Sequence, residues 1–458
     1  MKYIALTIGP IIDTLSLGRK TSEIWMASYL FSSFMKKTIQ EILKTSDAKF
    51  LVPYVEDSKL FDTKDDGIGK FHDRFIFTTQ TTNLSTIEKI LTKQKNTLAS
   101  MIANSIQRDE KKVQDFFQSY LQTYLFESSE QYEDPVIEIS KILDSIELNI
   151  PLLEADEDYI RLFLNRNIVL NSALAKESFG KKPSFDSIEA IAAQENSSDL
   201  EVQNAKKYIA IIHADGDNLG QYIKSQANVS TISKQLFDFD NKAVQSIKEY
   251  GGIPLFIGGD DLLIFAPVIN AKKETVFNLV DKLSNDYEEM LGTKKTTLSF
   301  GISITYYKYP LYEALEKSRN ALFSVAKNYT SQEGNEKNAV AISAQKHSGQ
   351  SFDFCIAKDE KGYEVFSAMI GSVLNENLEL PHAIHHKLFK YKALFENIKS
   401  VQLADTFDNI FNEDIHTDKF KEGLLLLKEL FLTLGLKKEQ QEKLFAMLST
   451  IKLIRGDR

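Results

Sequence analysis

The residues that could do chemistry stand at the ends of two predicted strands. The first set is Gly258–Asp261 (GGDD), which lies between the apolar runs Ile253–Ile257 and Leu262–Ala266. These runs predict a hairpin, because glycine supplies the backbone angles of a tight turn and lets a bulky ligand approach the main chain. Two adjacent carboxylates repel each other there, and a divalent metal bound to a phosphate would remove that cost. A lone GGDD is also a common turn, so the hypothesis of a catalytic site needs a second element.

That second element is an acidic cluster upstream. The run Tyr208–Ile212 predicts a buried central strand, and it leads into Asp215, Gly216 and Asp217. Asn218 could cap the helix that follows, and the free N–H groups at the amino end of a helix bind phosphate. The cluster therefore adds a candidate metal ligand, Asp215, and candidate nucleotide contacts at Gly216, Asp217 and Asn218.

The segments around these clusters predict a complete βαββαβ unit, the order of a ferredoxin-like or palm domain. Its further helices are expected over 234–250, 272–291 and 312–328, and its further strands over 296–306 and 338–344. In this order the two acidic tips lie at the same end of adjacent central strands. Asp215 with Asp260 or Asp261 could then hold two metal ions roughly 4 Å apart, stabilising both the attacking and the leaving oxygen of a phosphoryl displacement. Strand alternation points Asp260 and Asp261 in different directions, so both are candidate ligands.

A lysine near the end of the last predicted helix adds to this hypothesis. The ammonium group of Lys327 could reach a triphosphate held at the acidic tips. The alternative is a solvated cation at the carboxyl end of a helix, a placement that is favourable in itself. Lys327 is therefore a candidate nucleotide contact.

Residues 1–90 echo the pattern of the catalytic unit. Strands are expected over 3–8, 50–55 and 71–78 and a helix over 21–43, whose buried stripe is Ile24, Ala27, Phe31, Met35 and Ile42. The turn Asp65–Lys70 stands where GGDD stands in the second unit, but it lacks the double glycine and the adjacent acids. We infer a pseudo-dimeric partner that contributes a substrate pocket without metals. Asp73 and Arg74 could face this acceptor pocket; the alternative is an exposed strand pair.

The fold class expected from these patterns is α+β, with two ferredoxin-like (βαββαβ) palm domains in a pseudo-dimer arrangement, a helical insert and a helical C-terminal domain. The predicted domains are 1–90 (first, non-catalytic palm), 91–205 (helical linking domain), 206–350 (catalytic palm) and 360–458 (helical C-terminal domain). Segments 86–126 and 135–176 are predicted to be helical, and 127–134 and 195–199 to be polar linkers. The run Gly423–Leu436 contains charged residues and predicts a core helix.

The composition predicts a soluble, cytoplasmic protein with sizeable cores. The chain has 458 residues, 43% of them hydrophobic, and lacks an apolar run of the ~18 residues that a membrane span needs. We see no leader sequence before the first strand, which argues against secretion. A net charge of −9 argues against a protein that coats nucleic acid alone, because phosphate neutralisation dominates such binding. Cys355 is the one cysteine, which excludes a cysteine-rich zinc site and an internal disulfide framework.

Several motifs together resemble one known family. DGDNLG at 215–220 and IGGDDLL at 257–263, followed by FGISI at 300–304 and HSGQ at 347–350, resemble the catalytic palm of the large subunit of type III CRISPR effector complexes. Residues 4–30 resemble the first palm of the Cmr (type III-B) branch, with its Gly-Pro after the first strand and its Arg-Lys-Thr, Trp and Ser-Tyr helix. Lys182–Ala193 is similar to the segment before the catalytic palm. The resemblance spans most of residues 1–350 and is weak or undetectable in the last hundred.

This resemblance implies a nucleotidyltransferase that target RNA switches on. Such subunits work in a complex with other Cmr subunits, crRNA and target RNA, and they convert ATP to a second messenger, usually cyclic oligoadenylate. The resemblance implies that Asp215 and one or both of Asp260 and Asp261 hold two Mg²⁺ or Mn²⁺ ions, and that Gly258 and Gly259 leave room for the nucleotide. The position of Lys327 is similar to one that holds the triphosphate in the related GGDEF cyclases. Residues 363–458 look like a docking domain for small subunits.

Departures from the family pattern leave alternatives open. The family often carries an HD nuclease domain, but this chain starts at the first palm, and His72-Asp73 is an HD dipeptide in a strand-like context; we therefore expect no HD nuclease. Some relatives without that domain join AMP from ATP to S-adenosylmethionine, and the acid at Asp73 makes this product the main alternative. A stand-alone GGDEF-like cyclase that uses GTP and an inactive scaffold are weaker alternatives.

Overall fold

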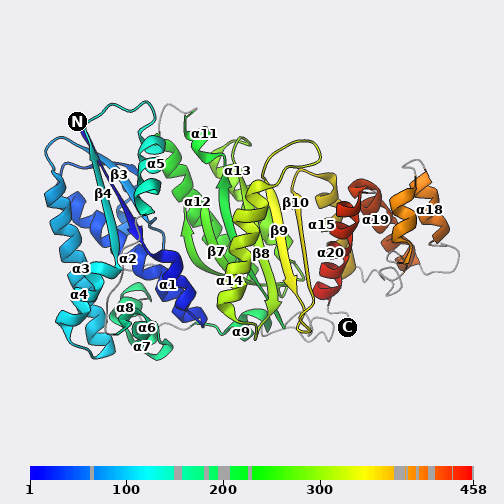
Figure 1. Ribbon diagram of the computed structural model, residues 1–458, viewed down its shortest axis with the longest axis horizontal. Helices are drawn as coiled ribbons and strands as arrows, with labels where there is room; N and C mark the ends of the chain where they lie inside the picture. Colours follow the sequence, from blue (N-terminus) through cyan, green and yellow to red (C-terminus); the bar gives the residue numbers. More distant parts are fainter. Residues whose placement is uncertain are drawn as a thin grey trace.

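Two sheets with their helices lie side by side, and a group of helices follows at the C-terminal end (Figure 1). The predicted α+β class is confirmed, including the repeated ferredoxin-like unit. The computed structural model describes residues 1–61, 67–148, 157–179, 185–193, 207–224, 229–375, 387, 390–398, 402–410, 418–435 and 437–455. The predicted linker 195–199 and part of the segment 182–193 lie outside these residues.

The first sheet is four-stranded and antiparallel, in the order β2-β3-β1-β4. Its strands are β1 (Lys2–Gly9), β2 (Lys49–Val52), β3 (Arg74–Thr79) and β4 (Gln122–Ser128). The helices α2 (Thr21–Thr45) and α3 (Leu84–Ile106) connect them into a βαββαβ unit, and the other helices of this part are α1 (Ile11–Leu17) and α4 (Glu110–Tyr120). The predicted stripe of α2 is confirmed, because Ile24, Ala27, Phe31, Met35 and Ile42 are all buried.

The strand β4 was missed, because we expected helix over 86–126 and a polar linker over 127–134. The apolar spacing of α4 runs directly into β4 with no glycine or proline between them, so the sequence gives no sign of a change in period. β4 pairs with β1 along its whole length, and most of its residues are only half-buried. The first sheet therefore continues past residue 90, and the predicted domain boundaries stay predictions.

The second sheet has six strands in the order β10-β9-β8-β5-β7-β6. Its first four strands along the chain, β5 to β8, have the same arrangement as β1 to β4, while β9 pairs in parallel with β8 and β10 adds an unpredicted edge hairpin after HSGQ. The strands are β5 (Tyr208–Asp217), β6 (Ile253–Gly258), β7 (Asp261–Pro267), β8 (Thr297–Tyr306), β9 (Ala339–Gln345) and β10 (Ser351–Ala357). The helices are α11 (Leu219–Lys224), α12 (Val229–Tyr250), α13 (Val276–Leu291) and α14 (Leu311–Asn320).

The first domain covers one face of the second sheet. Ile209 and Ile211 of β5 belong to the same hydrophobic core as α2 and the first sheet. The residues between them, such as Ala210 and Ile212, face the opposite core, which contains α12 and α13. Since side chains alternate along a strand, Asp215 lies on the face directed toward the first domain.

Helices make up the described remainder of the chain. Five of the described helices follow the first sheet and precede the second sheet along the chain. They are α5 (Pro135–Glu147), α6 (Tyr159–Phe163), α7 (Arg166–Asn171), α8 (Ala173–Phe179) and α9 (Ile188–Ala193). The C-terminal helices are α15 (Lys361–Asn375), α17 (Lys392–Asn397), α18 (Leu403–Ile410), α19 (Asp418–Leu434) and α20 (Lys438–Arg455). The predicted core helix at 423–436 is α19, with Leu424, Leu427 and Leu430 buried. Among the described helices, we find none long and apolar enough to span a membrane.

Candidate active site

The two acidic tips meet at one end of the second sheet. The predicted central strand is longer than expected, because β5 pairs with β8 as far as Asp217, so Asp215 lies within a strand and not in a loop after it. Gly258 pairs with Asp261, which leaves Gly259 and Asp260 as the two-residue hairpin turn. Gly259 has a φ of +70°, which explains the need for glycine there.

Gly216 allows the two tips to approach each other closely. A Cβ atom placed on Gly216 would lie only 2.4 Å from Oδ2 of Asp260 and 3.0 Å from its Cγ. The carboxylate of Asp260 therefore rests directly against the main chain beside Asp215. Asp261 begins β7 on the same side of the sheet as Leu263 and Phe265, the side that faces the first domain.

A cavity of about 890 Å³ separates the two palms and brings the predicted site residues together. Asp215, Asp260 and Asp261 line it from the second palm, and Asp73 and Arg74 line it from the first. These five residues come from three separate regions of the chain. The use of this cavity as an acceptor pocket stays a prediction.

The carboxyl groups of the site are held in a costly environment. Burial, with the charge of Asp215, raises the pKa of Asp260 to about 7. Burial raises the pKa of Asp261 well above its ordinary value, and the charges of Asp215 and Asp260 add to that effect. Burial also raises the pKa of Asp215, against the opposing charge of Lys327. A cation would relieve this repulsion, and carboxylate oxygens are ligands that Mg²⁺ and Mn²⁺ prefer.

The carboxylates of Asp215, Asp260 and Asp261 are of the kind that binds such cations, but their oxygen atoms do not surround a common metal position. Within the described ranges, no three His, Cys, Asp or Glu side chains form a group that could hold a metal ion. Asp215 is instead occupied by a lysine, since its Oδ2 lies 2.6 Å from Nζ of Lys327. The predicted two-metal site therefore stays a prediction, and it requires Lys327 to release Asp215.

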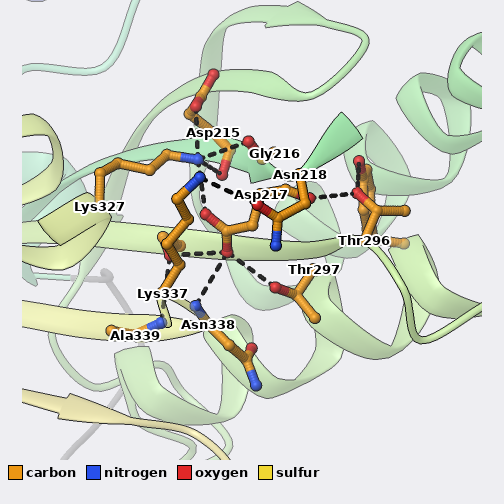
Figure 2. A network of polar contacts seen from close by, with 12 residues as sticks. Asp215, Gly216, Asp217, Asn218, Thr296, Thr297, Lys327, Lys337, Asn338 and Ala339 are labelled. Atoms are coloured by element: carbon orange, nitrogen blue, oxygen red, sulfur yellow. Dashed lines mark hydrogen bonds and ion pairs between the residues drawn. The ribbon is translucent and has the colours of Figure 1, made fainter. Parts of the chain in front are cut away.

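Lys327 lies in a cage of oxygen atoms (Figure 2). Its Nζ is 2.8 Å from Oδ1 of Asp217 and donates to the carbonyl oxygens of Asp215 (2.8 Å) and Gly216 (2.6 Å). The alternative of a solvated cation is wrong, because the side chain is only 13% exposed. The predicted single helix at 312–328 is also interrupted, since a π-helical turn at Ala321–Val325 follows α14 and a 3₁₀ turn carries Lys327.

Asp217 holds this cage to the sheet. It is fully buried, and its Oδ2 accepts hydrogen bonds from the Thr297 and Ser299 hydroxyls (both 2.8 Å) and from the Asn338 main chain (3.1 Å) (Figure 2). With both oxygens engaged, Asp217 positions Lys327 and joins β5 to β8 and β9. Its predicted contact with a nucleotide is not needed to explain its burial and stays a prediction.

Asn218 links the acidic cluster to a second lysine. Its φ is 57°, and its Oδ1 accepts a hydrogen bond from Nζ of Lys337 (3.1 Å). The helix that it precedes, α11, has only six residues. The nucleotide contacts predicted for Asn218, Gly216, Gly258 and Gly259 stay predictions.

The first palm contributes an acid and a paired arginine. His72 and Asp73 precede β3 instead of lying within a strand, and burial raises the pKa of Asp73 to about 6. Arg74 pairs with Asp144 (2.6 Å) and Glu147 (2.7 Å) of α5. Because these carboxylates neutralise Arg74, the first-palm side of the cavity does not present it as a free cation.

Sequence reasoning missed two residues that contact the GGDD turn. Asp240 of α12 is 2% exposed, and its Oδ1 accepts a hydrogen bond from the Gly259 main chain (2.8 Å). The ring of His72 lies over the same glycine. Asp240 could have been found, because it is an acid on the apolar stripe with Ala243, Val244 and Ile247; for His72 the local sequence holds no comparable signal.

Two family descriptions match this chain. "Cas10/Cmr2, second palm domain" matches residues 208–341, and "CRISPR-associated protein Cmr2, N-terminal" matches residues 3–117. Together they span more than half of the chain. The first covers all three candidate metal ligands, and the second covers Asp73 and Arg74.

Individual relatives agree with these matches. The CRISPR system Cmr subunit Cmr2 of Pyrococcus furiosus is 27% identical over 278 residues, which cover 53% of this chain and 31% of that protein. The type III-B Cmr-beta apo structure aligns with a TM-score of 0.68 at 10% identity, over 99% of this chain and 81% of that one. A Csm1–Csm4 cassette in complex with one ATP aligns with a TM-score of 0.54 at 14% identity, over 100% of this chain and 70% of that one. These structures share the fold.

Proposed function

We propose that this chain, which belongs to the Cas10/Cmr2 family as a Cmr large subunit, uses its second palm to transfer AMP from ATP. One observation carries the proposal: Asp215 and the distant pair Asp260 and Asp261 line one cavity between the two palms. A helical or scaffolding role needs none of these acids, and their raised pKa values make them costly to keep together.

The chemistry would be a phosphoryl displacement. Asp215, Asp260 and Asp261 would hold divalent cations, which stabilise the attacking and leaving oxygens of such a reaction. Once Asp215 engages a cation, Nζ of Lys327 would turn from its carboxylate toward phosphate oxygens while it keeps its contact with Asp217. Gly216 lets the Asp260 carboxylate lie against the main chain beside Asp215, which would keep the two acids close enough to share a cation. The burial of Asp260 and Asp261 strengthens these charge interactions, because charges interact more strongly away from water.

The partners follow from the family. A Cmr-beta complex has been solved bound to cognate target RNA, and the Csm1–Csm4 cassette has been solved with ATP, AMPPNP and cA4. By analogy with those proteins, we propose that this chain works with other Cmr subunits, crRNA and target RNA. Its messenger would be a cyclic oligoadenylate made when target RNA is bound.

A second product is favoured by the charges of the cavity. Asp13, Asp73 and Glu147 line it from the first-domain side, where Arg74 is already paired. Acidic walls suit a cationic acceptor, and the sulfonium group of S-adenosylmethionine is such a cation. Attack by this acceptor on the α-phosphorus of ATP, in place of attack by a second ATP, would break the α–β phosphoanhydride bond, give the AMP conjugate and release pyrophosphate.

Product identification tests both candidates. The purified complex with ATP, Mn²⁺ or Mg²⁺ and cognate target RNA should form an adenylate product, analysed by mass spectrometry with and without S-adenosylmethionine. Polymer made in the presence of S-adenosylmethionine excludes the conjugate.

The double variant Asp260→Ala, Asp261→Ala should lower the yield of product by about a hundredfold or more, because it removes the charges that stabilise the transition state. The exposed Asp238→Ala is the matched control. Unchanged yield in the double variant contradicts the proposed function.

A further inference from the structure

A short segment of the first palm, Gly69–Asp73, crosses to the second palm and follows its β6 strand. Gly69 forms an isolated parallel bridge with Phe256, and its carbonyl accepts a hydrogen bond from the Ile257 main chain (3.2 Å). The main chain of Phe71 donates to the Ser32 hydroxyl (2.9 Å), which fixes the segment to α2. This cross-palm segment therefore connects the long helix of the first palm to the strand that leads into GGDD.

The cross-palm segment places an imidazole on one side of the GGDD turn. A Cβ atom at Gly259 would lie 2.8 Å from Cε1 of His72, and a Cβ atom at Gly258 would lie 3.3 Å from the same atom. The His72 ring therefore leaves no room for a side chain at Gly259, whereas a Cβ atom at Gly258 would first meet the Phe256 ring, at 2.5 Å. Burial lowers the pKa of His72 to about 4, so the ring is neutral and packs as a flat, uncharged group.

Asp240 contacts the same turn from α12. Its Oδ1 accepts from the Gly259 main chain at 2.8 Å, and its side chain is buried in a mostly apolar helix stripe. A two-residue hairpin forms without such a partner, and burying a carboxyl group is costly. Next to it, Asn241 accepts a hydrogen bond from Nζ of Lys70 (3.1 Å), which ties the cross-palm segment to α12.

We propose that His72 and Asp240 are positioning residues that hold the GGDD turn between them, so that the docked first palm sets where Asp260 and Asp261 lie relative to Asp215. This inference rests on the proposed function and deepens it: the non-catalytic palm shapes the metal-binding tip as well as the acceptor side of the cavity. Residues behind metal ligands tune metal affinity tenfold to a hundredfold. Removing either contact should therefore weaken cation binding more than it weakens ATP binding.

Asp240→Asn and Asp240→Leu form a matched pair. The amide of asparagine keeps an oxygen that accepts from Gly259, whereas leucine fills similar space without one. Binding of Mn²⁺ to the full chain is measured by electron paramagnetic resonance of the free ion, alongside kcat and KM for ATP in the complex. We expect Asp240→Leu to bind Mn²⁺ about tenfold more weakly and to lower kcat with little change in KM, and Asp240→Asn to match the wild type. Wild-type binding in Asp240→Leu, or equal loss in both variants, overturns the proposal.

His72 supplies the test if Asp240→Leu does not fold. His72→Phe keeps a flat neutral ring over the turn, and His72→Ala removes it. We expect His72→Ala to weaken Mn²⁺ binding severalfold and His72→Phe to retain it; unchanged binding in His72→Ala overturns the proposal. The double variant Asp260→Asn, Asp261→Asn tests the proposed function separately from the positioning inference. If this double variant still makes product, the proposed function fails. If the double variant is inactive while His72→Ala and Asp240→Leu behave as wild type, only the positioning inference fails.

Discussion

The two palms share one strand arrangement and differ at the tips that face each other. The order β2-β3-β1-β4 corresponds strand for strand to β6-β7-β5-β8. In the second palm, a two-residue turn joins the hairpin, and β5 carries acids to its last residue. In the first, the segment Gly69–Asp73 before β3 crosses to the neighbouring palm, and β1 ends at Gly9. The shared frame therefore does not account for the acidic cavity; the residues at two strand ends do.

Acids serve opposite purposes in the two palms. In the first, Asp47 accepts from Thr79 and Thr82 hydroxyls and from the Gln80 main chain, and these hydrogen bonds, that of Thr79 first, hold its pKa well below its ordinary value. In the second, burial raises the pKa of Asp260. The first acid helps the domain to fold, whereas burial of the second costs stability.

The largest expected effect comes from removing the lysine that offsets this cost. Lys327→Met leaves the fully buried Asp217 without its cation, and breaking a buried ion pair from one side destabilises a protein by about 3 kcal/mol or more. We expect a fall of that size in the free energy of unfolding, measured with urea. Product formation should also fall, because the phosphate contact is lost.

Lys337→Met is the matched control for this prediction. Nζ of Lys337 donates to the Asn218 side chain, and a hydrogen bond of this kind contributes about 1 kcal/mol. Equal losses of stability in the two variants would show that Lys327 does not compensate buried charge. The comparison between the palms would then lose its energetic basis.

A smaller loss of stability is expected from Gly301→Ala, at the contact between β8 and α14. A Cβ atom at Gly301 would lie 2.2 Å from the Ser318 carbonyl oxygen and 2.3 Å from the Leu322 main-chain nitrogen. Gly301→Ala must push this helix away, at a cost of about 2 kcal/mol, typical of overpacking. Because Lys327 follows the same helix, activity should fall with the thermal midpoint.

Gly220→Ala provides the control, since a Cβ atom there meets nothing within 4 Å. We expect a change within about 0.5 kcal/mol, as for other exposed sites. If Gly301→Ala is equally mild, the second palm does not depend on close contact between β8 and α14. The glycine of the FGISI motif would then need another explanation.

Local patterns were enough to predict the second palm, because its strands are buried apolar runs with distinct turns. They also predicted Asp215, Asp260 and Asp261 as candidate ligands, and these three residues line one cavity. The cage around Lys327 could not be predicted, because it depends on a π-helical turn with no sequence marker. The contact of His72 with GGDD depends on docking between the palms, which no local period encodes. β4 was missed for a simpler reason: nothing in the sequence separates it from α4.

The smallest expected effect is a difference in pH dependence between an acid of each palm. The pKa of Asp47 is lowered from about 3.8, so its contribution to stability is present above that pH and is lost as the pH falls. The pKa of Asp260 is raised to about 7, so its contribution is present below pH 4 and is lost as the pH rises through 7. Without divalent cations at pH 8, Asp47→Asn should therefore lower the thermal midpoint and Asp260→Asn should raise it. The difference for Asp260→Asn should shrink toward pH 4, whereas the difference for Asp47→Asn should persist to about pH 4 and shrink only below it.

Scanning calorimetry in a chelating buffer at pH 4, 6 and 8 checks these signs. Mn²⁺ at pH 8 should reverse the ranking for Asp260, because the wild-type carboxylate then binds the ion and the amide does not. The midpoint of Asp47→Asn should rise with Mn²⁺ as much as that of the wild type. A wild-type response of Asp260→Asn to Mn²⁺ would mean that the two palms use their acids alike, and the distinction drawn between them would fail.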